Sequence, residues 1–257
     1  MISKLKYPIL GMIALLFVFP FGYIILLSLA RHWSFPAVWP KQLTFANWKM
    51  IFSAQGGMIR SFVISVVISL SVAFFSTLTG FITSKFIAYS RYRRALMLFS
   101  YFPFILSPVV YAGCIYFFFV KIGLSGTIPG VMIAQLIIAY PYAVIIFSGF
   151  WSDRLRSMEN LVTTLGGNKW QAYVKVLLPA ARGMLLVCFF QTYLISWFEY
   201  GLTSIIGVGQ VQTLTIKVFK YVNEANMYYA ALAACLLILP PVILLYINKR
   251  FIFKTRH

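Results

Sequence analysis

The chain has 257 residues, of which 61% are hydrophobic and only 10% are charged. A soluble domain usually carries about 25% charged residues, so this composition excludes a globular domain in water and also a disordered or collagen-like chain. The 22 Lys and Arg residues face only 4 Asp and Glu, and in a soluble protein the resulting net charge of +18 would indicate a nucleic-acid partner. In so apolar a chain, the excess of cations is better explained by an unequal distribution of Lys and Arg between the two sides of a membrane.

Six apolar segments are long enough to cross a bilayer, whose hydrocarbon core needs about 20 helical residues. They are expected at residues 7–30, 58–84, 96–120, 131–150, 184–206 and 227–247. The first exceeds the apolar core of a signal peptide and is interpreted as an uncleaved helix. Prolines recur in these segments, and neighbouring helices tolerate them in a membrane bundle. The predicted fold class is therefore all-α: a polytopic membrane protein with six transmembrane helices, in one domain over residues 1–257.

The cations separate unevenly between the two sides of these spans. Fifteen lie on the side of the N-terminus, including the run Arg91-Tyr92-Arg93-Arg94, and seven lie on the other side. The positive-inside rule then places both termini in the cytoplasm. The charge therefore indicates topology and contact with the lipid bilayer, and no nucleic-acid partner is expected.

The first external segment, residues 31–57, is rich in tryptophan and proline. Trp33, Trp39 and Trp48 accompany Pro36 and Pro40. Such aromatic residues are typical of the membrane–water interface. A docking surface for an external partner is the alternative interpretation.

The longest predicted cytoplasmic loop, residues 151–183, predicts two short helices joined by a tight turn. A first helix can start at Asp153, and Gly166 and Gly167 break it because glycine adopts positive φ freely. Trp170, Val174 and Leu177 then follow at helical spacing, and Pro179 is expected to end the second helix. From the residues alone, this hairpin is either an interfacial structure or a docking platform for a soluble partner.

This loop resembles that of the inner-membrane permease subunits of binding-protein-dependent ABC importers. The family signature is Glu-Ala-Ala, then a glycine, then a distal hydrophobic-x-x-Leu-Pro; here Glu159-Asn160-Leu161-Val162 precedes Gly166, and Val176-Leu177-Leu178-Pro179 follows. Leu161 and Val162 replace the usual alanines. The position before the fifth span is similar to maltose-type permeases. The segments 33–48 and 196–218 resemble iron, polyamine, thiamine and phosphonate-type permeases.

The resemblance implies a type I importer fold in which the loop is a coupling helix seated on a separate ATPase. Residues 159–166 would dock, and Trp170, Leu178 and Pro179 would pack the loop against the bundle. The coupling residues implied are Glu159, Asn160, Leu161, Thr164, Leu165, Gly166, Gly167, Trp170, Leu178 and Pro179. The implied partners are a second permease subunit, identical or paralogous, two ABC ATPase subunits and an extracytoplasmic solute-binding protein, in a bacterial inner membrane.

The fifth predicted span carries the candidate solute pathway. Thr192, Ser196, Glu199 and Thr203 fall on one face of a helix, and Glu199 is the one acidic residue inside any predicted span. Because a charge near the bilayer centre is costly, it should face the bundle or a water-filled cavity. The alternative is a structural hydrogen bond, or an ion pair with Lys217 or Lys220. On the fourth span, Gln135 and Tyr142 are further pathway candidates.

Catalytic motifs are missing from the sequence. It contains no G-x-x-x-x-G-K-[ST] phosphate-binding loop, so Mg-ATP is expected only on the partner ATPases, with no catalytic residue, cofactor or metal in this chain. A self-contained secondary transporter or channel is the main alternative, but no clear inverted repeat supports it. An integral membrane enzyme is the third, and its clustered His, Asp or Cys residues are missing.

Overall fold

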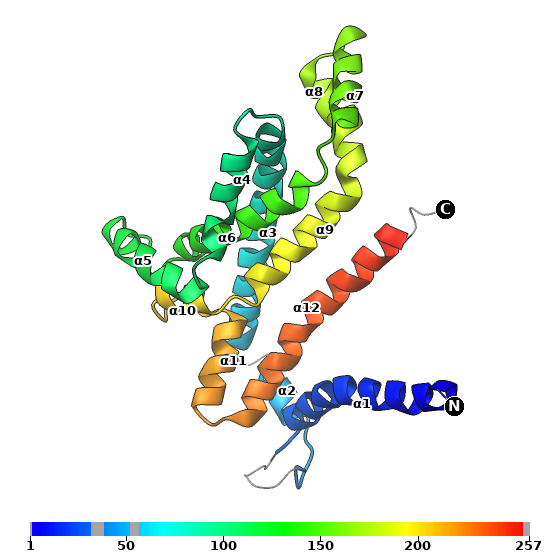
Figure 1. Cartoon of the computed structure of the whole chain (residues 1–257). Helices are drawn as coiled ribbons and strands as arrows, with labels where there is room; N and C mark the ends of the chain where they lie inside the picture. Colours follow the sequence, from blue (N-terminus) through cyan, green and yellow to red (C-terminus); the bar gives the residue numbers. More distant parts are fainter. Residues whose placement is uncertain (1, 32–38, 52–56, 254–257) are drawn as a thin grey trace. The chain divides into compact units, whose positions relative to one another are not determined.

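The computed structural model describes residues 2–31, 39–51 and 57–253, and in these ranges every regular element is a helix (Figure 1). One isolated antiparallel bridge joins Ala30 and Leu43. The elements are α1 Ile2–Ser28, α2 Ala46–Met50, α3 Met58–Ala88, α4 Arg93–Tyr101, η1 Phe102–Phe104, α5 Pro108–Lys121, α6 Ile128–Ser148, α7 Asp153–Thr164, α8 Lys169–Ala172, η2 Tyr173–Leu177, α9 Leu178–Trp197, α10 Gly201–Ile206, α11 Leu214–Asn223 and α12 Met227–Phe253.

Five helical segments in the described part of the chain are long and apolar enough to cross a membrane. They are Leu10–Ser28, Met58–Ala88, Ile128–Ser148, Lys169–Trp197 and Met227–Ile247. The all-helical, multi-pass fold class is confirmed, whereas the count of six spans is not reproduced exactly. The predicted fifth span, 184–206, is wrong at both ends, because its helix begins at Lys169 and stops at Trp197.

The third predicted span, 96–120, is broken by its prolines. Pro103 lies in the short turn η1, and Pro108 occupies the first turn of α5. The residue before a proline is pushed out of helical geometry, and Ser107 is extended there and caps α5 by accepting from the Val110 amide at 3.3 Å. The remaining apolar helix has 14 residues, about 21 Å at 1.5 Å per residue.

Other prolines are accommodated within helices, as predicted. Pro141 lies inside α6, where it is buried. Pro20 lies inside α1, and Pro240 and Pro241 lie inside α12. Pro129, like Pro108, lies in the first turn of its helix, α6.

The chain divides into two compact units, residues 1–64 with 213–240 and residues 65–212 with 241–257. In the first, α2 is tied to the end of α1. The Asn47 side-chain amide donates to the carbonyls of Ser28 and Ala30 at 3.1 and 2.8 Å, and the Trp48 indole donates to Ser28 Oγ at 3.2 Å. Trp39 is exposed. Trp33 and Pro36 of the predicted aromatic segment lie outside the described residues, so its interfacial role stays a prediction.

In the second unit, α3 and α6 are in close contact. A Cβ atom on Gly80 would overlap that of Ala143, so only glycine permits this approach. The Phe81 and Phe147 rings meet edge to face at 5.1 Å next to this contact. A stripe of small residues runs along α3, and its four serines are buried; it consists of Ser61, Ser65, Ser69, Ser76 and Gly80. Small residues let helix backbones approach in membranes, as they do at Gly80.

Candidate functional site

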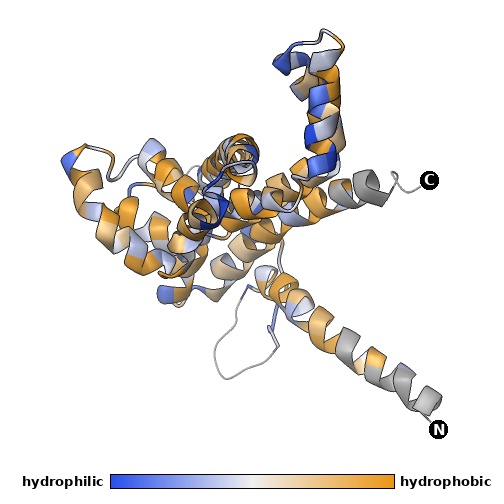
Figure 2. Ribbon diagram, turned by 45° about the horizontal axis from the view of Figure 1, so that its top comes forward, coloured by the Kyte–Doolittle hydropathy of each residue, from blue (hydrophilic) through white to orange (hydrophobic). Residues whose placement is uncertain are grey.

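The loop between α6 and α9 forms a helical hairpin, called here the coupling hairpin (residues 153–172). Figure 1 shows α7 and α8 side by side at the end of α9. Figure 2 shows that the long helices are mainly hydrophobic, whereas this hairpin carries many hydrophilic residues. The predicted pair of short helices with a glycine turn is thus present, with α7 starting at Asp153 as expected.

Two glycines close α7 for different physical reasons. Gly166 has φ +83°, and its amide donates to the carbonyl of Thr163 at 3.1 Å, while the Gly167 amide donates to Val162 at 2.9 Å. This pattern is a Schellman motif, in which a left-handed residue satisfies the last helical carbonyls. Gly166 has open space around it. At Gly167, a Cβ would lie 2.6 Å from Val162 Cγ1. Gly166 therefore supplies conformation and Gly167 supplies room.

The second helix of the hairpin starts with a capping box. Asn168 Oδ1 accepts from the Gln171 amide at 2.7 Å, and Gln171 Oε1 accepts from the Asn168 amide at 3.0 Å. An Asn followed three residues later by Gln is a sequence signature of a helix start. The glycine pair and this box together fix the turn to four residues, 165–168.

Pro179 does not end the second helix, contrary to the prediction. The helix runs without interruption from Lys169 to Trp197, with a π-turn at Tyr173–Leu177 directly before the proline. A proline ring clashes with the carbonyl four residues earlier and lacks an N–H group. A π-turn widens the helix at this point, which relieves the clash near Lys175. The hairpin is therefore continuous with a membrane-spanning helix.

The tip of the hairpin exposes large apolar side chains. Leu161, Leu165 and Trp170 are 59%, 85% and 72% exposed, and Asn160 and Thr164 are exposed beside them. Large apolar side chains clustered on a surface mark an interaction site. Trp170, Leu178 and Pro179, expected to pack the loop onto the bundle, are all exposed in this chain, although the Trp170 ring stacks on Tyr173 with ring centroids 6.4 Å apart, so their packing role stays a prediction. They lie off the helix face that carries Ala172 and Leu177, which are fully buried.

The residues that attach the base of the hairpin to α3 were not predicted from the sequence to do so. Trp151 packs on Phe81 with ring centroids 5.0 Å apart, and its indole donates to Ser84 Oγ at 2.8 Å. Phe81 also meets Tyr173 at 5.6 Å, and Leu177 belongs to the same buried cluster. The base of the hairpin is thus fixed to α3 by aromatic packing. A tryptophan at the end of an apolar segment is the only sequence signal for it.

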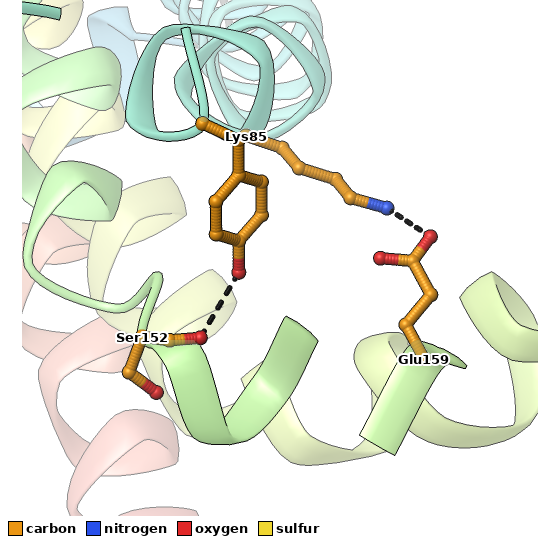
Figure 3. A network of polar contacts seen from close by, with 4 residues as sticks. Lys85, Ser152 and Glu159 are labelled. Carbon is orange, nitrogen blue, oxygen red and sulfur yellow. Dashed lines mark hydrogen bonds and ion pairs between the residues drawn. The ribbon is translucent and has the colours of Figure 1, made fainter. Parts of the chain in front are cut away.

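Glu159 makes an ion pair with Lys85 that was not predicted from the sequence. Its Oε1 accepts from Lys85 Nζ at 2.5 Å, and Figure 3 shows the lysine reaching from α3 to α7. Tyr89 Oη donates to the Ser152 carbonyl at 3.1 Å. Burial raises the pKa of the Tyr89 hydroxyl, and the negative charge of Glu159 raises it further, so this group stays a donor. Lys85 is one of the fifteen cations that the sequence places on the side of the N-terminus, and no partner was predicted for it.

The predicted pathway residues lie at the junction of two helices instead of on one helix face. Helix α9 ends at Trp197, and Thr203 belongs to α10. A chain of hydrogen bonds still unites the candidates. Ser196 Oγ donates to Gln135 Oε1 at 2.5 Å, Gln135 Nε2 donates to Thr203 Oγ1 at 2.8 Å, and Thr203 Oγ1 donates to Glu199 at 3.2 Å. We call this chain the polar relay.

Glu199 terminates the polar relay as a helix cap. Its carboxylate accepts from the amides of Leu202 at 2.9 Å and Thr203 at 3.1 Å, in the first turn of α10. A negative group at a helix N-terminus satisfies free amides and interacts favourably with the helix dipole. These bonds fit the structural alternative, and they do not test contact with solute. Thr192 lies one turn before Ser196 on α9, and its Oγ1 is 3.4 Å from Thr77 Oγ1. Tyr142, on α6, is partly exposed.

No group of three or more His, Cys, Asp or Glu residues that could hold a metal occurs among the described residues. What the arrangement offers is mechanical: a hairpin with an exposed apolar tip, anchored at its base and continuous with a spanning helix.

Residues 76–256 match the model of the family described as "binding-protein-dependent transport system inner membrane component". The chain belongs to this family. A 111-residue segment is 32% identical to "Sulfate permease 2, chloroplastic" of Chlamydomonas reinhardtii, and it covers 42% of this chain but only 30% of that protein.

Two solved structures share the fold over nearly the whole chain. One is a bacterial ABC transporter that imports the acidic polysaccharide alginate, with a TM-score of 0.71, 15% identity and coverage of 100% of this chain and 96% of that chain. The other is a bacterial alginate ABC transporter in complex with a periplasmic protein bound to an alginate pentasaccharide, with a TM-score of 0.69, 17% identity and coverage of 99% and 94%.

The predicted class is therefore confirmed. This permease is a transmembrane subunit of an ABC importer with the type I fold, and its family is an inner-membrane component of binding-protein-dependent transport. The secondary-transporter alternative is not favoured.

Proposed function

We propose that this permease forms half of a solute pathway and couples it, through the coupling hairpin, to ATP hydrolysis on separate subunits. The observation that carries this proposal is the exposed apolar tip formed by Leu161, Leu165 and Trp170, on a hairpin continuous with α9. A soluble partner that covers this tip and moves would move a membrane-spanning helix directly. The chain itself then needs neither Mg-ATP nor a catalytic residue.

The proposed assembly contains a second permease subunit, identical or paralogous, two ABC ATPases and an extracytoplasmic solute-binding protein. The complex of the alginate transporter with its periplasmic protein supports the last of these. The location is a bacterial inner membrane with both termini in the cytoplasm. The excess of Lys and Arg on the side of the hairpin supports this orientation.

The solute specificity of the importer is determined more by its binding protein than by this chain. The similarity of residues 33–48 and 196–218 favours iron, polyamine, thiamine or phosphonate, whereas the proteins named above act on sulfate and alginate. The cognate binding protein can be tested with these six solute classes by thermal shift. A rise in Tm with one class assigns the solute, because a ligand that binds the native state stabilises it.

The docking role can be tested by copurification of the permease with its ABC ATPase partner. Leu165→Asp places a charge in the apolar tip, and we expect it to abolish copurification while membrane insertion stays normal, because Leu165 is 85% exposed. Tyr92→Asp is the matched control, since Tyr92 is 68% exposed on the α3–α4 connection. Copurification of the Leu165→Asp variant at the wild-type level would contradict the proposal.

A further inference from the structure

Three hydrogen-bonded contacts join the end of α3 to the loop that carries the hairpin. Ser84 accepts from the Trp151 indole at 2.8 Å, Tyr89 donates to the Ser152 carbonyl at 3.1 Å, and Lys85 pairs with Glu159 at 2.5 Å. The first two contacts hold only the entrance of the loop. The ion pair lies seven residues further on, two turns along α7 (Figure 3). Of these three contacts, the one made by Lys85 lies furthest along α7.

One face of α7 is directed to α3 and the opposite face is left open. Glu159 comes four residues after Leu155 and three after Arg156, so it shares one side of the helix with both. Leu155 packs against the buried cluster at the hairpin base, and the Arg156 guanidinium lies 5.2 Å from the Tyr89 ring centroid. Leu161 and Leu165, on the other side, are exposed. The attachment to α3 and the apolar tip thus occupy different faces of the same helix.

The surroundings of the pair make Lys85 hard to replace. Its side chain is 23% exposed and that of Glu159 is 19% exposed. Lys85 Nζ lies 6.0 Å from the ring centroids of both Trp151 and Tyr173, so it also makes cation–π contacts. Arg156, the other cation on this face, lies over Tyr89. Removing one partner of a largely buried pair leaves the other charge uncompensated.

We propose that Lys85 is a positioning residue that locks α7 to the end of α3 through Glu159, so that a displacement of the coupling hairpin reaches α3 as well as α9. The inference rests on the proposed coupling function and adds a second mechanical route to it. Helix α9 receives the movement through the continuous backbone. Helix α3, distant in sequence, receives it through this ion pair, beside the packing of Leu155 and the contact of Arg156 with the Tyr89 ring.

The test measures whether α3 and α7 move together in the complete complex with its ATPases. Spin labels are placed at Phe86→Cys on α3 and Arg154→Cys on α7, both exposed, in a Cys114→Ser background because Cys114 is the exposed cysteine among the described residues. Distance distributions are recorded without nucleotide and after trapping with Mg-ATP and vanadate. The variants are Lys85→Met, Glu159→Gln and the exchange Lys85→Glu with Glu159→Lys, and Arg93→Met, an exposed cation on α4, is the control.

With intact Lys85, and in the Arg93→Met control, we expect a narrow distribution that trapping does not shift. Lys85→Met and Glu159→Gln should broaden it and make it shift on trapping, and the charge exchange should restore the narrow, unshifted distribution. An unchanged distribution in Lys85→Met, or a shift on trapping in the parent, overturns the proposal. If Lys85→Met does not assemble, the exchange decides alone: a narrow distribution supports the pair and a broad one overturns it.

Failure of the coupling function itself gives a different result. In that case the wild-type permease does not copurify with an ATPase, and no vanadate-trapped state forms. A complex that traps vanadate normally but shows no dependence on Lys85 overturns only the ion-pair inference.

Discussion

The indole of Trp151 donates a 2.8 Å hydrogen bond to Ser84 Oγ, which joins the first residue of the hairpin loop to the end of α3. Trp151 is 6% exposed and packs on Phe81. The hairpin is thus mounted on a rigid aromatic base, while its tip stays open. Rigid support beneath an exposed surface is what a mechanical coupling element requires.

Trp151→Phe should lower the stability of the permease without removing the packing. It loses one hydrogen bond, worth about 1 kcal/mol net, whereas Trp151→Ala also opens a cavity and should cost about 3–5 kcal/mol. The apparent Tm in detergent should therefore fall slightly for the first variant and strongly for the second. Trp39→Phe is the control, because Trp39 is 63% exposed. Equal Tm values for Trp151→Ala and wild type would contradict the anchoring role.

Gly166 and Gly167 should respond differently to substitution. Gly166→Leu forces a side chain into left-handed geometry, at about 1–2 kcal/mol, and we expect it to abolish uptake while membrane insertion remains. Gly166→Asn should retain most activity, since asparagine tolerates this conformation. Gly167→Ala has ordinary φ but lies too close to Val162 and should also impair uptake. Normal uptake by Gly166→Leu would argue against a coupling role for this turn.

Local signals in the sequence identified the hairpin well. The start of α7 at Asp153 and its end at the glycine pair follow from short-range rules of helix starts and stops, which act within a single turn. The docking role of Leu161 and Leu165 was expected only from the resemblance to the permease family. The same rules predicted that Pro179 ends the second helix, and this prediction is wrong. Its effect depends on whether the preceding turn can widen, and Tyr173–Leu177 does widen into a π-turn.

Long-range contacts left no comparable signal. Lys85 and Glu159 are 74 residues apart, and nothing in either local sequence marks them as partners. The polar relay is similar, because Ser196, Gln135 and Thr203 come from three helices. Helical spacing placed Ser196, Glu199 and Thr203 on one face, yet α9 ends before Glu199. The residues selected by helical spacing are thus close together, but a turn between α9 and α10, which the sequence did not predict, brings them together.

Gln135 should contribute to the stability of the permease through two hydrogen bonds at once. It accepts from Ser196 and donates to Thr203, and it is only 2% exposed. Gln135→Leu removes both hydrogen bonds, at about 0.5–1.5 kcal/mol each, because Ser196 keeps Ser69 and Thr203 keeps Glu199 as partners, and it should lower the apparent Tm. Gln135→Glu keeps the acceptor for Ser196 and should be milder at a pH where the carboxyl is protonated. A Gln135→Leu variant with wild-type Tm would show that the relay adds no stability.

Glu199→Gln separates the two interpretations of the acidic residue. The amide keeps one oxygen for the Leu202 or Thr203 amide of α10, so the helix cap is weakened but not removed. If the negative charge serves the pathway, uptake should fall while the amount of assembled complex stays the same. Glu199→Asp, which keeps the charge on a shorter side chain, is the matched control and should retain more uptake than the glutamine variant. Loss of the assembled complex in Glu199→Gln would instead assign the residue to structure, because a cap at the start of α10 then has the larger effect.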